Sequence, residues 1–114
     1  MSADAGNTIW TPLYWGDYLR DTQDLDLQQH GAYFRLLAHY YTAGPPIPNT
    51  PKVWYRICGA MEDEEKAAVE YVATRFFRDD GNGGLIHKRA DKEIQRRRER
   101  SDAGRKGARA RWQQ

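Results

Sequence analysis

The sequence predicts a mainly α-helical domain with a small β-hairpin, followed by a basic C-terminal helix and tail. Apolar residues recur at helical spacing in several segments, a glycine-rich turn separates two short apolar runs, and Lys and Arg dominate the last segment. We therefore divide the chain into an acidic, aromatic-rich body, residues 1–87, and a basic segment, residues 88–114.

Charge and aromatic side chains are distributed unevenly between these two parts. Residues 1–87 carry 7 Lys or Arg and 12 Asp or Glu, whereas residues 88–114 carry 11 and 4. The net charge is therefore −5 in the body and +7 in the basic segment. Thirteen of the fourteen aromatic residues lie between Trp10 and Phe77. A small body relies on such rings for its core, while a basic segment most often binds the phosphates of a nucleic acid.

The first segment, residues 10–25, is aromatic but irregular, because Pro12 and Gly16 interrupt it. A body this small needs most of its large rings in the core. We therefore expect this segment to lie across the core.

The strongest predicted helix covers residues 27–42. Asp26 and Gln29 form a capping-box pattern at its start, and apolar residues then recur at helical spacing. Gly44, followed by Pro45, predicts its end, since glycine accepts the left-handed cap and proline cannot continue the hydrogen-bond ladder.

Two further helices are expected before the hairpin. The first begins with Asn49 or Thr50 as its N-cap and ends at Gly59. Asp63 is the predicted N-cap of the second, whose apolar stripe ends near Phe76.

The predicted hairpin consists of strands at 76–78 and 85–87, with a glycine-rich turn between them. Residues 88–100 are strong helix formers with Ile94 as their single large apolar side chain, so we expect a solvated or partner-bound helix. Glycines follow at 104 and 107. They permit either a loop in which Arg105 and Lys106 present backbone amides to phosphate or a flexible linker. This order of elements is that of a winged-helix domain with extra helical segments at its ends.

Several sequence strings also carry a family resemblance. They are WGDYLRDT at 15–22, LDL at 25–27, HGAYFRLL at 30–37, GPPIP at 44–48, the FF-to-DG turn at 76–81, HKR at 87–89 and the closing RSDAGRKGARARW at 100–112. Together they resemble the YdaU-like family of phage and prophage proteins (DUF1376), over nearly the whole chain. Members of that family often form the N-terminal part of phage replication proteins and are similar to winged-helix DNA-binding domains. The resemblance implies a DNA-binding or replication role in a bacterial host cell.

The basic segment contains the best candidates for contacts with DNA. On a helix, Arg89, Lys92 and Arg96 share one face, and neighbouring arginines widen the positive surface. Cations at this spacing can follow a phosphate backbone without reading the base sequence. The expected phosphate contacts are Lys88, Arg89, Lys92, Arg96, Arg97, Arg98, Arg100, Arg105, Lys106, Arg109 and Arg111. Arg78 is a candidate contact on the hairpin, which would be the wing of a winged-helix domain. Trp112 is a candidate for stacking on a base. The alternative for the basic segment is a solvated charged tail.

The third helix has the wrong charge for a recognition helix in a major groove. Its start carries four carboxylates, Glu62, Asp63, Glu64 and Glu65, which phosphates would repel. A protein-partner face made of these carboxylates is therefore the alternative. Trp54 and Tyr55 would belong to that face if both are exposed. The protein would then be an adaptor for a phage or host replication protein, and a transcription regulator is a third hypothesis.

The sequence indicates no catalytic site, metal site or cofactor. The three histidines and the single cysteine, Cys58, do not fall at metal-ligand spacings, and no nucleotide-binding or catalytic motif is present. No apolar run is long enough to cross a bilayer, and residues 1–8 do not resemble a secretion signal. We therefore expect a cytoplasmic protein that is not an enzyme and does not contact membranes. The oligomeric state is left open.

Overall fold

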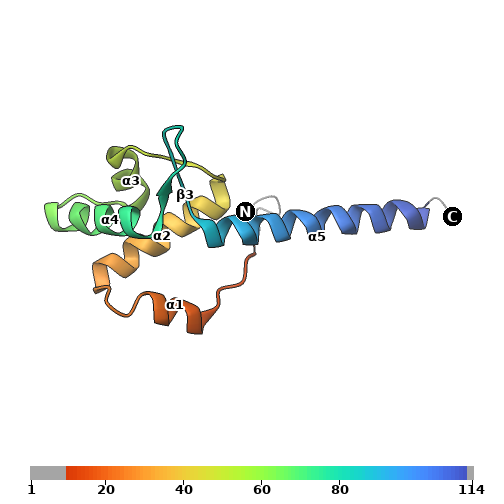
Figure 1. Ribbon diagram of the computed structural model, residues 1–114, viewed down its shortest axis with the longest axis horizontal. Coiled ribbons are helices and arrows are strands. Elements are labelled where there is room, and N and C mark those ends of the chain that lie inside the picture. The colour runs from red at the N-terminus through yellow and green to blue at the C-terminus, as the bar shows by residue number, and fades with distance from the viewer. Residues whose placement is uncertain (1–9, 113–114) are drawn as a thin grey trace, which may run out of the picture.

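The computed structural model describes residues 10–112, with the backbone alone for residues 105, 106 and 108–112. The elements follow in the order α1 (Trp15–Asp21), α2 (Leu27–Ala43), β1 (Ile47–Pro48), α3 (Pro51–Cys58), α4 (Asp63–Phe76), β2 (Arg78–Asp79), β3 (Gly84–Ile86) and α5 (Lys88–Trp112). Helices α2, α3 and α4 pack together with a small sheet, and α5 projects from them as a long arm (Figure 1). The mainly helical class is confirmed.

Helix α2 is the central element of the body, and its start and end are as predicted. The Asp26 carboxylate accepts the backbone N–H of Gln29 at 2.8 Å, and the Gln29 side chain accepts the N–H of Asp26 at 2.9 Å. Gly44, with φ of 90°, donates its N–H to the Tyr40 carbonyl and ends the helix. The predicted capping box therefore forms.

The core lies between α2, α3, α4 and the sheet. Leu36, Tyr40, Ile47 and Val72 are fully buried in it. Trp54 is also buried, with 4% of its surface exposed, and donates its indole N–H to the Pro48 carbonyl at 2.8 Å. Trp54 and Tyr55 are therefore not both exposed, which was the condition for including them in the protein-partner face. Trp54 belongs to the core because helix α3 turns it toward the sheet.

The N-cap of α4 is Glu62, one residue earlier than predicted. The Glu62 side chain accepts the backbone N–H of Glu65, while the Glu65 carboxylate accepts the N–H groups of Glu62 and Met61, each at 2.9 Å. This reciprocal pairing satisfies free amides at the start of the helix. Asp63 is therefore the first helical residue and not the cap.

The sheet has three antiparallel strands in the order β1-β3-β2, whereas the sequence predicted two. In the added strand, β1, Ile47 pairs with Leu85 of β3. The first hairpin strand, β2, is shorter than expected and begins later, because Phe76 still belongs to α4. Strand β3 has the expected length but begins one residue earlier, so His87 lies beyond it. Gly84 is required here, since a Cβ atom at this position would lie 2.6 Å from the Pro46 Cβ.

Most of the aromatic segment 10–25 lies outside the core, contrary to expectation. Trp10, Trp15 and Leu19 are 68%, 64% and 61% exposed, and α1 has no buried residue. Thr22 and Leu25 are the residues of this segment that are buried. Rings from α2, α3 and α4 already fill the core, so α1 covers its edge instead.

Helix α5 is continuous and is anchored through its first turns. Ala90 and Ile94 are buried against the body, whereas residues 98–104 are exposed. The expectation of a solvated helix therefore holds for its outer part and fails for its start. Gly104 and Gly107 lie within the helix, so the linker expected there does not form.

Candidate nucleic-acid interface

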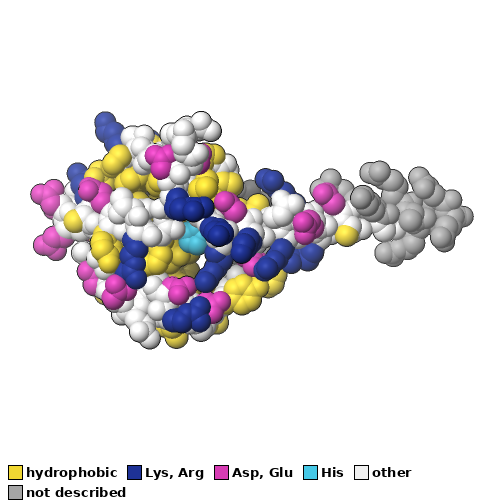
Figure 2. Space-filling view, in the orientation of Figure 1, with side chains coloured by type: hydrophobic (Ala, Val, Ile, Leu, Met, Phe, Trp, Pro, Cys, Tyr) yellow, Lys and Arg dark blue, Asp and Glu magenta, His cyan; other side chains and the backbone are white. Residues whose placement is uncertain are grey.

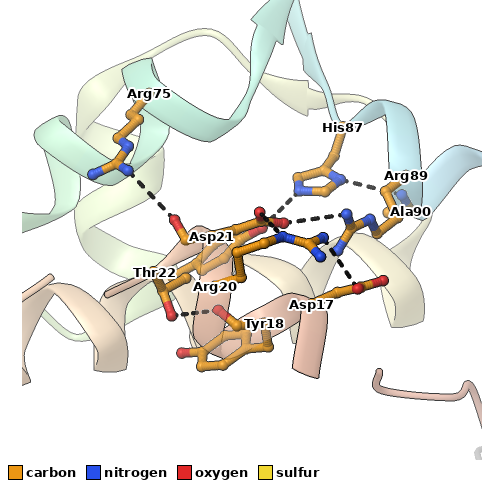
Figure 3. A network of polar contacts seen from close by, with 10 residues as sticks. Asp17, Tyr18, Arg20, Asp21, Thr22, Arg75, His87, Arg89 and Ala90 are labelled. Carbon is orange, nitrogen blue, oxygen red and sulfur yellow. Dashed lines mark hydrogen bonds and ion pairs between the residues drawn. The ribbon is translucent and has the colours of Figure 1, made fainter. Parts of the chain in front are cut away.

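His87 connects the sheet to α5 and determines where the basic helix begins. Its ring is 8% exposed, and Nδ1 accepts the backbone N–H of Ala90 at 3.1 Å. The proton therefore resides on Nε2, which donates to the Tyr33 hydroxyl at 2.9 Å. The His87 backbone N–H donates to the Tyr40 hydroxyl at 3.0 Å, and that hydroxyl donates to Asp91. The side chains of Tyr33, Tyr40, His87 and Asp91 thus hold the first turn of α5 (Figure 3 shows His87 and Ala90).

These anchoring groups are uncharged at neutral pH. Burial lowers the pKa of His87 to about 4 and raises the pKa of Tyr33 to about 12. Burial is also the main cause that raises the pKa of Tyr40. The charge at the base of α5 therefore comes from its Lys, Arg and acidic side chains.

An ion pair attaches α1 to α5, and a hydrogen bond attaches the end of α1 to Arg75 of α4 (Figure 3). The Asp21 carboxylate lies 3.1 Å from Arg89 and 3.5 Å from Arg20. Arg75 binds Asp24 at 2.6 Å and also donates to the Asp21 carbonyl at 3.4 Å. Arg89, one of the predicted phosphate contacts, is therefore already paired with the Asp21 carboxylate of α1.

Four cationic side chains from two elements meet where α5 leaves the body. Asp91, Gln95 and Glu99 of α5 line a shallow hollow there, together with four cationic residues, Arg78 of β2 and Lys88, Lys92 and Arg96 of α5. We call these four residues the basic face. Figure 2 shows dark blue side chains gathered at this junction. Within the described part of the chain, Arg78, Lys88 and Lys92 form no ion pair.

A second hollow adjoins the basic face on the side of α1. Lys88, Arg89, Lys92 and Arg96 line it together with Tyr14, Asp17 and Glu93, and we call it the basic hollow. Arg96 binds the Glu93 carboxylate at 2.6 Å, and the Glu93 side chain is 4% exposed. The Arg96 side chain remains 56% exposed, so it compensates a buried carboxylate and still reaches solvent.

The consecutive arginines 96–98 lie in three different surroundings. Arg97 is half-buried and donates to the Tyr41 carbonyl at 3.5 Å, near the end of α2. Its Nη1 is buried and has no hydrogen-bond partner within the described residues. Arg98 is exposed on another side of α5, near Pro45 and Asp80. Arg97 therefore contributes less to the accessible positive surface than the sequence suggested.

The outer part of α5 extends the positive charge away from the body. Arg100 is exposed on it. The side chains of Arg105, Lys106, Arg109, Arg111 and Trp112 lie outside the described residues, and their predicted contacts stay predictions. The helical backbone at 105 and 106 does not form the separate phosphate loop that two glycines would permit.

The acidic start of α4 lies at the opposite end of the body from the α5 arm (Figure 1). Glu62, Asp63 and Glu64 are exposed, although Glu62 also takes part in the capping box. Tyr55 is half-buried near this end and donates its hydroxyl to Glu70. The proposed protein-partner face is therefore reduced to its carboxylates and Tyr55.

The sequence did not predict a cavity beside the basic hollow. Its volume is about 320 Å³, and it lies between residues 11–14, α2 and the start of α5. The aromatic residues that line it were assigned to the core. The large number of aromatic residues in this part of the sequence was a signal for such a site. The sequence alone did not show that these residues surround a cavity.

The chain matches a known protein family. The family described as "Protein of unknown function (DUF1376)" matches residues 9–95. The chain belongs to this family. The DUF1376 match includes Lys88 and Lys92 and ends within α5, before Arg96.

One curated relative supports the same conclusion. "Uncharacterized protein YdaU" of Escherichia coli (strain K12) is 35% identical over 103 residues, which are 87% of this chain and 35% of the relative. The chain thus spans about a third of the length of that DUF1376 relative. The YdaU-like resemblance read from the sequence strings is confirmed. No solved structure matches the chain.

The described part of the chain offers neither a membrane-spanning helix nor a cluster of metal ligands. None of its helices combines the length and apolar character that crossing a membrane requires. Within residues 10–104, no group of three or more His, Cys, Asp or Glu side chains is placed to hold a metal ion.

Proposed function

We propose that this protein binds DNA, mainly through phosphate contacts from the basic face and the exposed arm of α5, and acts in the initiation of phage or prophage DNA replication. One observation carries the DNA-binding part. Arg78 of the hairpin and Lys88, Lys92 and Arg96 of α5 come from separate elements and line one hollow. The replication part is what the YdaU-like resemblance implies.

The spacing of these cations suits a phosphate backbone. Lys88, Lys92 and Arg96 recur every four residues, so they follow one face of α5 over roughly 12 Å. Backbone phosphates follow one another within each strand at intervals smaller than this, so several can be contacted at once. The contacts would give affinity with little sequence preference.

The order of elements supports a winged-helix-like arrangement in which the hairpin is the wing. Helices α2, α3 and α4 precede β2 and β3, with α1 as an additional helix before them, and β1 completes a three-stranded sheet. Asp79 and Asp80 accept backbone N–H groups of the turn, from Gly81 at 2.7 Å and Asn82 at 2.7 Å. Their carboxylates are thereby partly satisfied within the hairpin. The acidic start of α4 counts against a recognition helix in the major groove, and therefore against a transcription regulator.

The test is fluorescence anisotropy of labelled DNA titrated at several salt concentrations with the intact chain and with the triple variant Arg78→Gln/Lys88→Gln/Lys92→Gln. Each lost phosphate contact lowers the slope of log affinity against log salt by about 0.9 on duplex DNA, so we expect a decrease of about 3. Arg96 is left unchanged because it compensates the buried Glu93.

The matched control is Arg35→Gln/Lys52→Gln/Arg56→Gln, which removes the same charge from exposed positions of α2 and α3. It should lower the affinity only slightly, since distant charges are screened by salt. Equal losses in the two triple variants would reject the basic face as the binding surface. Absence of DNA binding by the intact chain would reject the proposal.

A protein-interaction adaptor is the second candidate, favoured by the exposed carboxylates of α4 at the end of the body opposite the basic face. A phage or host replication protein with a basic surface would be the partner. Under this hypothesis, neutralising Asp63 and Glu64 with Asn and Gln abolishes capture of that partner after nuclease treatment, while the triple variant of the basic face does not.

A further inference from the structure

The cavity beside the basic hollow has the walls of a ligand pocket. Its volume of about 320 Å³ falls in the range of roughly 300–1,000 Å³ typical of small-ligand sites. Rings and aliphatic side chains from three segments line it, among them Tyr14, Tyr18, Phe34, Leu37 and Tyr41. Figure 2 shows this face hollowed beside the dark blue side chains.

The polar groups of the pocket are neutral or already compensated. Burial raises the pKa of Tyr33 to about 12 and also raises that of Tyr41. The two carboxylates that reach the pocket are Asp21 and Glu93, which are paired with Arg89 and Arg96 respectively. A flat, uncharged, partly polar group would therefore meet rings and hydrogen-bonding atoms but no uncompensated charge.

The pocket adjoins the basic hollow directly. Tyr14, Arg89 and Glu93 line both, and the hollow adds Lys88, Lys92 and Arg96. A ligand that extends from one into the other would thus place an aromatic group among the tyrosines and an anion beside the cations of α5. Single-stranded nucleic acid has this chemistry, because each of its unpaired bases lies next to a phosphate.

We propose that the pocket receives an unpaired base of single-stranded DNA while the adjoining phosphates bind Lys88, Lys92 and Arg96. This inference rests on the proposed function and specifies its strand preference. A base within a duplex is paired and stacked, so reaching the pocket would first require unstacking it. Duplex DNA would contact the basic face alone and would bind more weakly.

Two substitutions test the pocket without altering the buried core. Tyr14→Ala removes an exposed ring that lines both the pocket and the hollow, and Ala38→Trp places a large ring at a pocket position on the exposed side of α2. The matched control is Trp15→Ala, which removes a neighbouring exposed ring that does not line the pocket. Circular dichroism confirms that each variant is folded.

The probe is a short oligonucleotide carrying the fluorescent base 2-aminopurine, single-stranded or paired with its complement, titrated with the intact chain and the three variants. We expect the single strand to bind about tenfold more tightly than the duplex at equal salt, and 2-aminopurine to be quenched as it stacks on a ring. Tyr14→Ala and Ala38→Trp should each weaken single-strand binding about tenfold, within the range measured for loss of one stacking ring. Duplex binding, the salt slope and the Trp15→Ala control should not change.

The outcomes separate this inference from the proposed function. Equal binding of single strand and duplex, with no effect of Tyr14→Ala or Ala38→Trp, would overturn the base pocket and leave phosphate binding by the basic face standing. Equal weakening by all three ring variants would also overturn it, since the pocket position would then be irrelevant. Absence of binding to either form would overturn both proposals and favour a protein ligand for this surface.

Discussion

Helix α2 and helix α5 are held in place by different kinds of contact. Leu36 and Tyr40 of α2 are fully buried, and neighbouring helices surround them on several sides. Helix α5 is anchored by Ala90, Ile94 and the hydrogen bonds around His87, and its outer part, residues 98–104, is exposed. The comparison teaches that the positive charge of this protein is carried mainly by a helix that extends from the body, and that the exposed side chains of its outer part contribute little to folding. Stability and binding can therefore be changed separately.

The largest effect is expected from Leu36→Ala in the core. The side chain is completely buried, and deleting it leaves a cavity, so the free energy of unfolding should fall by about 2–5 kcal/mol. Urea denaturation followed by circular dichroism measures it. Leu27→Ala, at a position 87% exposed, is the control and should change stability by less than about 0.5 kcal/mol. Similar effects of the two substitutions would contradict the core described here.

Acidification should weaken the anchor of α5 through His87. Its pKa is about 4 in the folded protein and about 6.5 in the unfolded chain, so the unfolded state binds the proton first as the pH falls. Stability is therefore lost between about pH 6.5 and pH 4, by about 3 kcal/mol in total and about 2 kcal/mol between pH 7 and pH 5.

Urea denaturation at pH 7 and pH 5 measures this loss. Carboxylates also titrate in the acid range, so the intact chain is compared with His87→Gln, which lacks the imidazole. The variant should lose about 2 kcal/mol less than the intact chain between these pH values. An equal loss in both proteins would show that His87 is not the group responsible.

A smaller effect is expected from Tyr40→Phe, which removes a hydroxyl and keeps the ring. The hydroxyl accepts the buried N–H of His87 and donates to Asp91, so its loss leaves a buried donor unsatisfied at the start of α5. The free energy of unfolding should fall by about 1–3 kcal/mol. Hydrogen exchange should accelerate in the first turn of α5 more than in α4. Tyr55→Phe, which removes an exposed bond to Glu70, is the matched control.

The smallest effect on stability is expected on the arm. Arg98→Gln/Arg100→Gln changes two exposed side chains, so the free energy of unfolding should change by less than about 0.5 kcal/mol. The salt slope for duplex DNA should nevertheless fall by up to about 2, since each phosphate contact contributes about 0.9. A marked loss of stability in this variant would show that the arm packs on the body more than its exposure indicates.

Local signals explain why the helices of the body were predicted well. Asp26 and Gln29 specify the start of α2 through bonds between residues three apart, and Gly44 specifies its end through its own backbone angle. The N-cap of α4 was displaced by one residue because Glu62 and Asp63 both have acceptor side chains, and the pairing with Glu65 decides between them.

The features that were missed depend on contacts between distant residues. Strand β1 consists of two residues and exists because Ile47 lies beside Leu85. Trp54 is buried whereas Trp10 and Trp15 are exposed. This difference depends on which rings pack into the core, and the sequence around each tryptophan does not indicate it. The cationic residues of α5 were predicted as phosphate contacts from the sequence of the basic segment alone. The addition of Arg78 was suggested from the order of elements, but the unequal surroundings of Arg96, Arg97 and Arg98 follow from the packing of α5 on α2.

His87 is the single residue between β3 and α5, and hydrogen bonds hold both its backbone and its ring. These bonds fix the residue at which the sheet meets the long helix, so α5 has little freedom to rotate relative to the sheet. An arm mounted in this way acts as a lever. A force applied to its outer turns would therefore reach Tyr33 and Tyr40 in the core through the bonds around His87.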